Sequence, residues 1–272
     1  MNGIPLTARE TRPEGTIVTA ASAVFGGKRL AVIAGPCAVE SEEQVVSTAR
    51  LVKAAGAVLL RGGAYKPRTS PYQFQGLREE GMRLLVLAKE ETGLGVVTEV
   101  MDVRHLEKIA EVADMLQIGS RNMQTFTLLD EVGRMSKPVL LKRGMMATVD
   151  EFLLAAERIA AGGNGSIVLC ERGIRTFEVA TRNTLDLNAV ALLKRRSHLP
   201  VIVDPSHGTG QWWMVPHMAR GAVAVGADGL IVEVHVRPEE ALCDGFQSLS
   251  PGTFERMMRE IRAVAEAVGR EL

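Results

Sequence analysis

Short apolar runs rich in β-branched residues recur along the chain and alternate with longer segments of helical periodicity. The runs are LAVIAGP (30–36), AVLLRGG (57–63), GVVTEVM (95–101), MLQIGS (115–120), PVLLKRG (138–144), SIVLCERG (166–173), PVIVDPSHG (200–208) and GLIVEVHV (229–236). A short continuous apolar run of this kind is typical of a strand that is buried on both faces. Eight strand–helix units in succession predict an α/β fold, the (β/α)8 TIM barrel.

Start signals stand ahead of several of the helical segments. They have the spacing of a capping box, or they place a cap residue before a proline at the first helical position: Ser41 with Gln44, Thr148 with Glu151, and Ser250 before Pro251. These signals support helices that begin near residues 42, 149 and 251.

Residues 1–29 precede the first of the eight runs, and TIVTA with AVFGG around Ser22 predicts a short N-terminal β-hairpin extension. Such a hairpin could cover the floor of the barrel or one edge. No linker or low-complexity tract interrupts residues 30–272, which we interpret as one catalytic barrel. An extension of 29 residues is too short for an independent regulatory domain, so we expect activity that is insensitive to Phe, Tyr and Trp.

Composition narrows the class of protein. The 272 residues are 46% hydrophobic, and 32 basic side chains balance 32 acidic ones. This balance argues against a nucleic-acid partner or an anionic membrane surface. No apolar run reaches the length of a membrane span, and the N-terminal residues lack the layout of a secretion signal, so we expect a cytoplasmic protein. The chain has three widely spaced cysteines, which argue against a disulfide framework and against a structural zinc site.

Polar residues stand where nearly every predicted strand ends, which in such a barrel is where the active site lies. In order they are Cys37, Arg61, Glu99, Ser120 with Arg121, Lys142, Glu171 with Arg172, His207, and Glu233 with His235. The loop segment RGGAYKPRTSPYQFQG (61–76) adds Lys66 and Arg68, and Pro67 and Pro71 keep it from forming a helix. The cations outnumber nearby carboxylates and predict a ligand with several negative charges, such as a substrate pair with two phosphates and a carboxylate.

A second group of strand-end and loop residues could hold a metal ion: Cys37, His207, Glu233 and Asp244. A thiolate, an imidazole and two carboxylates suit one divalent ion such as Mn²⁺, Fe²⁺, Co²⁺ or Zn²⁺. Each residue also has an ordinary structural interpretation, since Cys37 could be a core residue and Asp244 before Gly245 a turn former. Only their expected common location favours a metal.

Seven motifs in order resemble those of 3-deoxy-D-arabino-heptulosonate 7-phosphate (DAHP) synthase. They are GPCAVES (35–41), RGGAYKPRTSPYQFQG (61–76), IGSRNMQ (118–124), LLKRG (140–144), ERGIRTFE (171–178), DPSHGTG (204–210), and EVH with DGFQSL (233–235 and 244–249). The chain is similar to the short form that is related to 3-deoxy-D-manno-octulosonate 8-phosphate synthase. The resemblance implies condensation of phosphoenolpyruvate with erythrose 4-phosphate in the first step of the shikimate pathway, by a homo-oligomer such as a dimer or tetramer.

The resemblance also implies roles for individual residues. The metal ligands would be the four residues named above, and Lys66, His207 and Glu99 would be catalytic, with Lys66 protonating the new alkoxide and Glu99 positioning water. The substrate-binding set would be Arg61, Lys66, Pro67, Arg68, Thr69, Ser120, Arg121, Lys142 and Arg172. In this set Arg121 and Arg172 would hold the phosphate of phosphoenolpyruvate, while Arg68 and Thr69 would bind that of the aldose.

The sequence departs from the family pattern at Ser120, Cys243 and Phe246, where alanine, serine and proline are usual. Three alternatives remain open. In the octulosonate synthase, which uses a five-carbon aldose phosphate, the segment KPRTS typically reads KANRSS, so residues 67–69 favour the four-carbon substrate. A Schiff-base aldolase would use Lys142 as its nucleophile. A non-catalytic barrel would use the cations to bind an anionic regulator.

Overall fold

The computed structural model describes residues 3–66, 68 and 70–272. Eight parallel strands close into a barrel in the order β10-β3-β4-β5-β6-β7-β8-β9, which confirms the predicted fold. Their bounds are β3 (Ala31–Gly35), β4 (Leu59–Arg61), β5 (Gly95–Glu99), β6 (Met115–Ile118), β7 (Val139–Lys142), β8 (Ile167–Glu171), β9 (Val201–Val203) and β10 (Gly229–Glu233).

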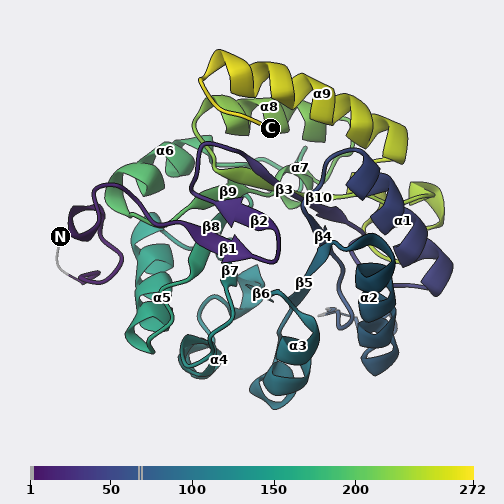
Figure 1. Cartoon of the computed structure of the whole chain (residues 1–272), viewed down its shortest axis with the longest axis horizontal. Coiled ribbons are helices and arrows are strands. Elements are labelled where there is room, and N and C mark those ends of the chain that lie inside the picture. Colours follow the sequence, from purple (N-terminus) through teal and green to yellow (C-terminus); the bar gives the residue numbers. More distant parts are fainter. Residues whose placement is uncertain (1–2, 67, 69) are drawn as a thin grey trace.

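A ring of helices surrounds the barrel (Figure 1). They are α1 (Glu42–Ala54), α2 (Glu79–Thr92), α3 (Leu106–Val112), α4 (Phe126–Gly133), α5 (Val149–Ala161), α6 (Leu187–Arg196), α7 (Pro205–Thr209), α8 (Val215–Ala224) and α9 (Pro251–Ala267). The predicted caps are present: Ser41 accepts from the Gln44 amide, Thr148 and Glu151 form a capping box, and Ser250 caps α9 ahead of its N-terminal proline. Among the described residues, no helix has both the length and the apolar content needed to cross a membrane.

The end of the seventh predicted run needs correction, because PVIVDPSHG does not continue as a strand to residue 208. Strand β9 ends at Val203, and Pro205 begins α7. The Asp204 side chain accepts a hydrogen bond of 2.9 Å from the His207 amide and so caps this short helix. An aspartate cap followed by proline is a helix start, and it turns His207 over the end of the barrel.

Strand alternation divides the inside of the barrel into an apolar floor and a polar top. The lower lumen is filled by Ala31, Ile33, Leu59, Val97, Met115, Leu140, Val168, Cys170, Ile202 and Ile231. Since side chains two residues apart on a strand share a face, the next lumen positions are Gly35, Arg61, Glu99, Gln117, Lys142, Arg172, Asp204 and Glu233. The residues of opposite parity, such as Leu60 and Val232, pack outward in the core that includes the helices.

Gly35 allows the first strand to approach its neighbour closely. A β-carbon at this position would lie 2.2 Å from the carbonyl oxygen of Arg61, and the residue has a φ of +151°. Both conditions favour glycine. The close approach brings the Cys37 loop next to the strand that carries Arg61.

The predicted hairpin is present as β1 (Val18–Ala20) and β2 (Ala23–Phe25), which pair antiparallel with Val18 opposite Phe25. It lies across the front of the barrel in Figure 1, at the end opposite the carboxyl ends of the strands. Val18, Ala20, Ala23 and Phe25 belong to the same buried cluster as the lower lumen. The hairpin therefore closes the floor of the barrel and keeps water from its apolar interior.

Replacing Phe25 by alanine tests this sealing role. Phe25 is fully buried, so Phe25→Ala should lower the free energy of unfolding by about 3–5 kcal/mol, as for other buried phenylalanines. Val24 lies beside it on the same strand but is 44% exposed, and Val24→Ala is the matched control with an expected change below about 1 kcal/mol. Urea unfolding followed by circular dichroism measures both, and equal losses would contradict the sealing role.

Candidate active site

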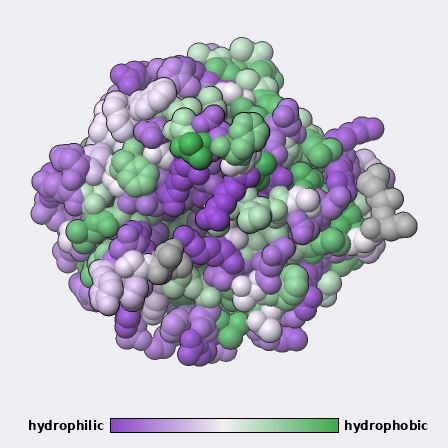
Figure 2. Space-filling model, turned by 180° about the vertical axis from the view of Figure 1, so that it is seen from behind, coloured by the Kyte–Doolittle hydropathy of each residue, from purple (hydrophilic) through white to green (hydrophobic). Residues whose placement is uncertain are grey.

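A polar cavity of about 230 Å³ opens at the carboxyl ends of the barrel strands. Its lining is dominated by charged residues: Arg61, Lys66, Arg68, Glu99, Arg121, Lys142, Arg172, Arg182, His207 and Asp244, with Gln73, Gln117, Gly119, Ser120 and Met145 between them. Figure 2 shows this end of the molecule, with hydrophilic residues gathered near its centre. The top layer of the lumen thus forms the floor of an open site.

Seven cations line the cavity, and only part of their charge is balanced by carboxylates. Arg61 pairs with Glu233, Lys142 with Asp204, and Arg182 with Asp244. Among the described residues, no ion pair joins Lys66, Arg68, Arg121 or Arg172 to a carboxylate. Burial lowers the pKa of Arg172, but a guanidinium remains charged at neutral pH. The cavity is therefore suited to a polyanion.

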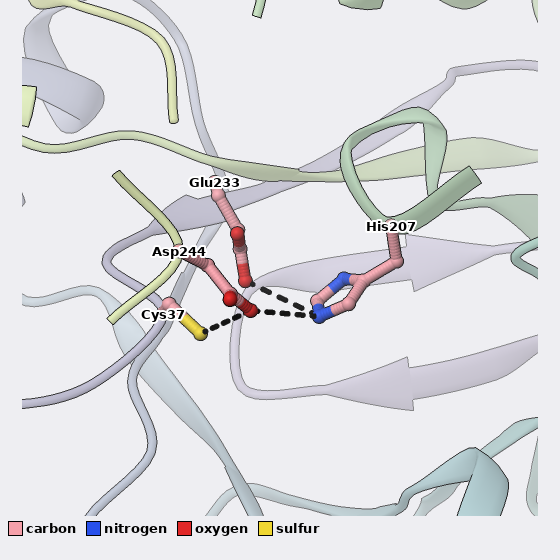
Figure 3. Close-up of side chains that lie close together, drawn as sticks. All are labelled: Cys37, His207, Glu233 and Asp244. Atoms are coloured by element: carbon pink, nitrogen blue, oxygen red, sulfur yellow. Dashed lines mark hydrogen bonds and ion pairs between the residues drawn. The ribbon is translucent and has the colours of Figure 1, made fainter. Parts of the chain in front are cut away.

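The four candidate metal ligands meet at one side of this cavity. Their donor atoms all lie within 4.8 Å of one another, and Figure 3 shows Cys37, His207, Glu233 and Asp244 pointing toward a common centre. With metal–ligand bonds of about 2.0–2.3 Å, donor atoms around one ion lie at most about 4.6 Å apart, so the cluster has nearly the size of a coordination shell. These four ligands are far apart in the sequence, and they meet because the strands that precede them close into a barrel.

The imidazole of His207 is oriented by Asp204. Its Nδ1 lies 2.8 Å from Asp204 Oδ2, so Nδ1 carries the proton and donates to the carboxylate. Burial lowers the pKa of His207, against the opposing effect of Asp204 and Glu233, so the ring is neutral at neutral pH. Nε2 is then an unprotonated acceptor. A carboxylate that holds the far nitrogen in this way is typical of metal-binding histidines.

Nε2 faces another acceptor rather than a donor. Glu233 Oε1 lies 3.4 Å from it and Asp244 Oδ2 lies 3.9 Å from it. Glu233 Oε1 is buried and accepts no hydrogen bond from the described residues, although the Arg61 guanidinium lies 3.1 Å away as an ion pair. A neutral imidazole nitrogen beside carboxylate oxygens is an arrangement that a cation between them would satisfy. The donor set therefore fits a divalent metal ion.

The carboxylates at the centre remain ionised despite their burial. Burial alone raises the pKa of Asp204, Glu233 and Asp244, but the neighbouring cations, together with His207 when its ring is protonated, outweigh burial and all three pKa values are lowered. For Asp244 the charges of Arg182, of protonated His207 and of Lys66 lower the pKa to about 2. All three side chains can therefore act as anionic acceptors near neutral pH.

Cys37 is part of a sulfur-rich corner of the site. Its Sγ lies 3.3 Å from Cys243 Sγ and 3.4 Å from Asp244 Oδ2, and Lys66 Nζ donates to it over 3.1 Å. The hydrogen bond with Cys243, together with burial, raises the pKa of Cys37. Arg68 reaches the same corner, with Nη1 2.7 Å from Cys243 Sγ. Lys66 keeps its proton. Burial lowers its pKa, but the surrounding cysteines and carboxylates have the larger effect, and the net pKa lies above the ordinary value for lysine.

Glu99 lies over the backbone of the next strand. A β-carbon on Gly119 would meet Glu99 Oε1 at 1.9 Å, so only glycine leaves room for this carboxylate. Ser120 and Arg121 follow directly in a 3-10 turn, Ser120–Asn122, and line the cavity beside it. The IGSRN segment thus supplies space for one carboxylate and positions one cation.

The structure brings most of the predicted site residues together. Arg61, Lys66, Arg68, Glu99, Ser120, Arg121, Lys142, Arg172, His207 and Asp244 line the cavity, and Cys37 and Glu233 complete the ligand cluster. Pro67 and Thr69 lie outside the described residues. Glu171 and His235, two further strand-end residues, lie elsewhere: Glu171 faces outward and pairs with Arg143 at 2.9 Å, and His235 lies 3.4 Å from Glu40.

Several residues of the site were not identified from the sequence, among them Gln117, Asp204, Arg182 and Gln247. Gln117 and Asp204 share strand parity with lumen residues, so alternation counted outward from the apolar floor would have found them. Arg182 is on a loop and Gln247 ends a single 3-10 turn, Gly245–Gln247, so neither belongs to a segment long enough to show a periodicity. Their positions depend on tertiary contacts alone.

Comparison with known proteins identifies the family of this chain. Residues 15–269 match the model of the DAHP synthetase I family. A phospho-2-dehydro-3-deoxyheptonate aldolase of Thermotoga maritima is 52% identical over 97% of this chain and 78% of that protein. A 2-dehydro-3-deoxyphosphooctonate aldolase of Syntrophotalea carbinolica is 35% identical over 90% of this chain and 94% of its own length.

Solved structures show the same fold. The crystal structure of the Thermotoga maritima DAHP synthase superposes with a TM-score of 0.95 at 51% identity, over 98% of this chain and 78% of that one. A truncated form of the synthase from the same organism superposes with a TM-score of 0.92 at 47% identity, over 98% of both chains. With the barrel, the cation-lined cavity and these matches together, the chain belongs to the DAHP synthetase I family and is an enzyme of the DAHP synthase type.

Proposed function

We propose that this enzyme condenses phosphoenolpyruvate with erythrose 4-phosphate and water to give DAHP and phosphate, using one divalent ion such as Mn²⁺, Fe²⁺, Co²⁺ or Zn²⁺. The observation that carries the proposal is the ligand cluster beside an excess of cations in one cavity. A cytoplasmic location and a homo-oligomeric state remain predictions.

The ion would be held by Cys37 Sγ, His207 Nε2 and the carboxylates of Glu233 and Asp244, whose donor atoms already face one another. When bound, it supplies a Lewis acid for the aldehyde carbonyl of the aldose. Asp204 keeps the proton on Nδ1 of His207 and so keeps Nε2 available. The aldehyde end of the aldose would therefore lie on the side of the cavity next to this cluster.

Binding of phosphoenolpyruvate is assigned to the cations on the rest of the cavity floor. By the resemblance of their motifs, Arg121 and Arg172 would hold its phosphate, and both line the cavity. Arg61, Lys66 and Lys142 would surround its carboxylate and reacting carbons. Fixed cations that are already in place stabilise negative charge without reorganisation during the reaction.

Two side chains can move or position protons. Lys66, which remains an ammonium group 3.1 Å from Cys37 Sγ, is placed beside the ligand cluster to protonate the alkoxide that forms on the aldose. Glu99, seated over Gly119, would orient the water that adds at the carbon bearing the phosphate ester. Lys142 is a poor candidate for a Schiff-base nucleophile because its amine is engaged 2.5 Å from the buried Asp204 carboxylate.

The direct test follows phosphoenolpyruvate consumption with erythrose 4-phosphate and, separately, with arabinose 5-phosphate, each with and without a chelator. We expect consumption with the four-carbon aldose that the chelator abolishes and added metal restores. Faster turnover with the five-carbon aldose would favour the octulosonate reaction instead. Turnover that resists the chelator would contradict metal dependence.

Replacing His207 by alanine should abolish both metal binding and turnover. The side chain is a central donor of the cluster but contributes little to the apolar core, so the barrel should stay folded. His217→Ala is the control, because His217 is an exposed histidine that contacts Arg220 on α8. Metal content by plasma mass spectrometry, activity and circular dichroism are compared. A folded His207→Ala protein with full metal content and turnover would refute the assignment.

Replacing Arg68 by alanine should mainly raise the KM for the aldose phosphate. Loss of one hydrogen bond to a charged group costs about 1.5–3 kcal/mol, which is roughly a 10- to 150-fold change in kcat/KM. Arg121→Ala is the matched comparison, with its larger effect expected on phosphoenolpyruvate. Steady-state kinetics with each substrate varied in turn separates the two. The opposite pattern would mean that the two phosphate sites are reversed.

The nearby thiols predict a redox sensitivity of the metal-free protein. Cys37 and Cys243 have their sulfur atoms 3.3 Å apart, so a small approach brings them to disulfide bonding distance of about 2.05 Å. Exposure of metal-free protein to oxidised glutathione should release two reduced glutathione molecules per disulfide and lower the protein mass by about 2 Da. Bound metal should protect Cys37, and Cys243→Ser should prevent the bond. Only free thiols in the metal-free wild-type protein would disprove this.

A further inference from the structure

Arg182 lies at the edge of the ligand cluster, on the loop between β8 and α6. Its backbone amide donates to the Thr209 carbonyl over 3.0 Å, and the neighbouring Asn183 side chain donates to the His207 carbonyl over 2.9 Å. A β-carbon on Gly210 would lie only 2.4 Å from Arg182 Cβ, so the stem of the arginine packs against the end of α7. The loop is therefore fastened to the helix that carries His207.

The guanidinium of Arg182 contacts one carboxylate ligand directly and the other through an amide. Its Nη1 lies 3.2 Å from Asp244 Oδ2 and donates to Gln247 Oε1 over 2.7 Å. The amide nitrogen of Gln247 in turn donates to Glu233 Oε2 over 2.6 Å. Gln247 is fully buried, so neither of its two bonds can readily be exchanged for one to water.

Asp244 needs such support because of its backbone. It has a φ of +55°, in the left-handed region, which aspartate enters more readily than most residues but at a cost of about 1 kcal/mol relative to ordinary backbone. The next residue, Gly245, has room for glycine only, since a β-carbon there would lie 2.2 Å from the Pro238 carbonyl oxygen. A strained loop keeps its ligand in place only when other contacts hold it.

We propose that Arg182 is a positioning residue for the metal centre, which holds Asp244 directly and Glu233 through Gln247 in the geometry that the ion requires. The inference rests on the metal site of the proposed function and extends it to a residue outside the ligand set. Asp244 Oδ2, the oxygen that Arg182 contacts, is also the one that faces Cys37 Sγ and His207 Nε2. Arg182 therefore restrains the carboxylate oxygen closest to the centre.

The sign of the effect distinguishes positioning from simple electrostatics. A guanidinium that acted only through its charge would repel a divalent cation, so its removal would tighten metal binding. A guanidinium that holds two ligands in place would, on removal, weaken binding. Loss of an outer partner of a metal ligand typically lowers metal affinity about 10- to 100-fold.

The experiment titrates metal-free full-length protein with Co²⁺ and follows the absorption of the cobalt–thiolate bond, which does not depend on turnover. We expect Arg182→Ala to raise the Kd for Co²⁺ about 10- to 100-fold, and Gln247→Leu to raise it by a smaller factor. Because the two residues act in one chain of contacts, the double variant should show less than the product of the single effects. Arg175→Ala, an exposed arginine on the same loop, should leave the Kd unchanged.

Circular dichroism and thermal unfolding of each variant establish that it is folded. Arg182→Lys serves as a second variant, which keeps the positive charge but lacks the planar guanidinium with its paired N–H donors. An unchanged or lower Kd in folded Arg182→Ala would overturn the inference while leaving the metal site intact. Absence of cobalt binding in the unsubstituted protein would overturn the proposed metal site, and this inference with it.

Discussion

The hydrogen bond between Asp204 and His207 determines what the centre of this site can hold. It fixes the proton on Nδ1 over 2.8 Å, and the other Asp204 oxygen caps α7 through the His207 amide. One carboxylate therefore sets both the position of the histidine and its tautomer. Nε2 is left facing Glu233 Oε1 at 3.4 Å, an acceptor opposite an acceptor. A divalent ion between His207 Nε2 and Glu233 Oε1 would satisfy both atoms. The cation-lined cavity and the sulfur-rich corner at Cys37 lie next to this position.

The fold supplies these contacts through the simplest property of a strand, its alternation. Each barrel strand contributes apolar residues to the lower lumen and, two positions further on, a charged, polar or small residue to the top. The β1–β2 hairpin closes the apolar end, and the charged cavity opens at the opposite end. Charged groups such as Glu233 and Arg61 can be buried at this level because they pair with each other.

The same alternation explains how much the sequence could predict. Eight apolar runs were enough for the barrel, and the ends of the runs were enough for most of the cavity lining. The run at 200–208 was extended too far, because apolarity does not reveal that Asp204 caps a helix. Arg182 could not be predicted, since its loop has no period and its partners lie more than 60 residues away. The proximity of Cys37 and Cys243 could be expected, by contrast, because Cys37 is a candidate ligand and Cys243 adjoins another, Asp244; the pairing of β10 with β3 helps to bring them together.

Anomalous X-ray diffraction from crystals of the protein grown with Co²⁺, measured on both sides of the cobalt absorption edge, tests the account most directly. The account predicts one strong peak bonded to Cys37 Sγ and His207 Nε2 and to carboxylate oxygens of Glu233 and Asp244, at distances of about 2.0–2.3 Å. His207 should keep its Nδ1 contact with Asp204. A cobalt peak only at other residues, or no peak at the cluster in crystals with saturating cobalt, would contradict the account.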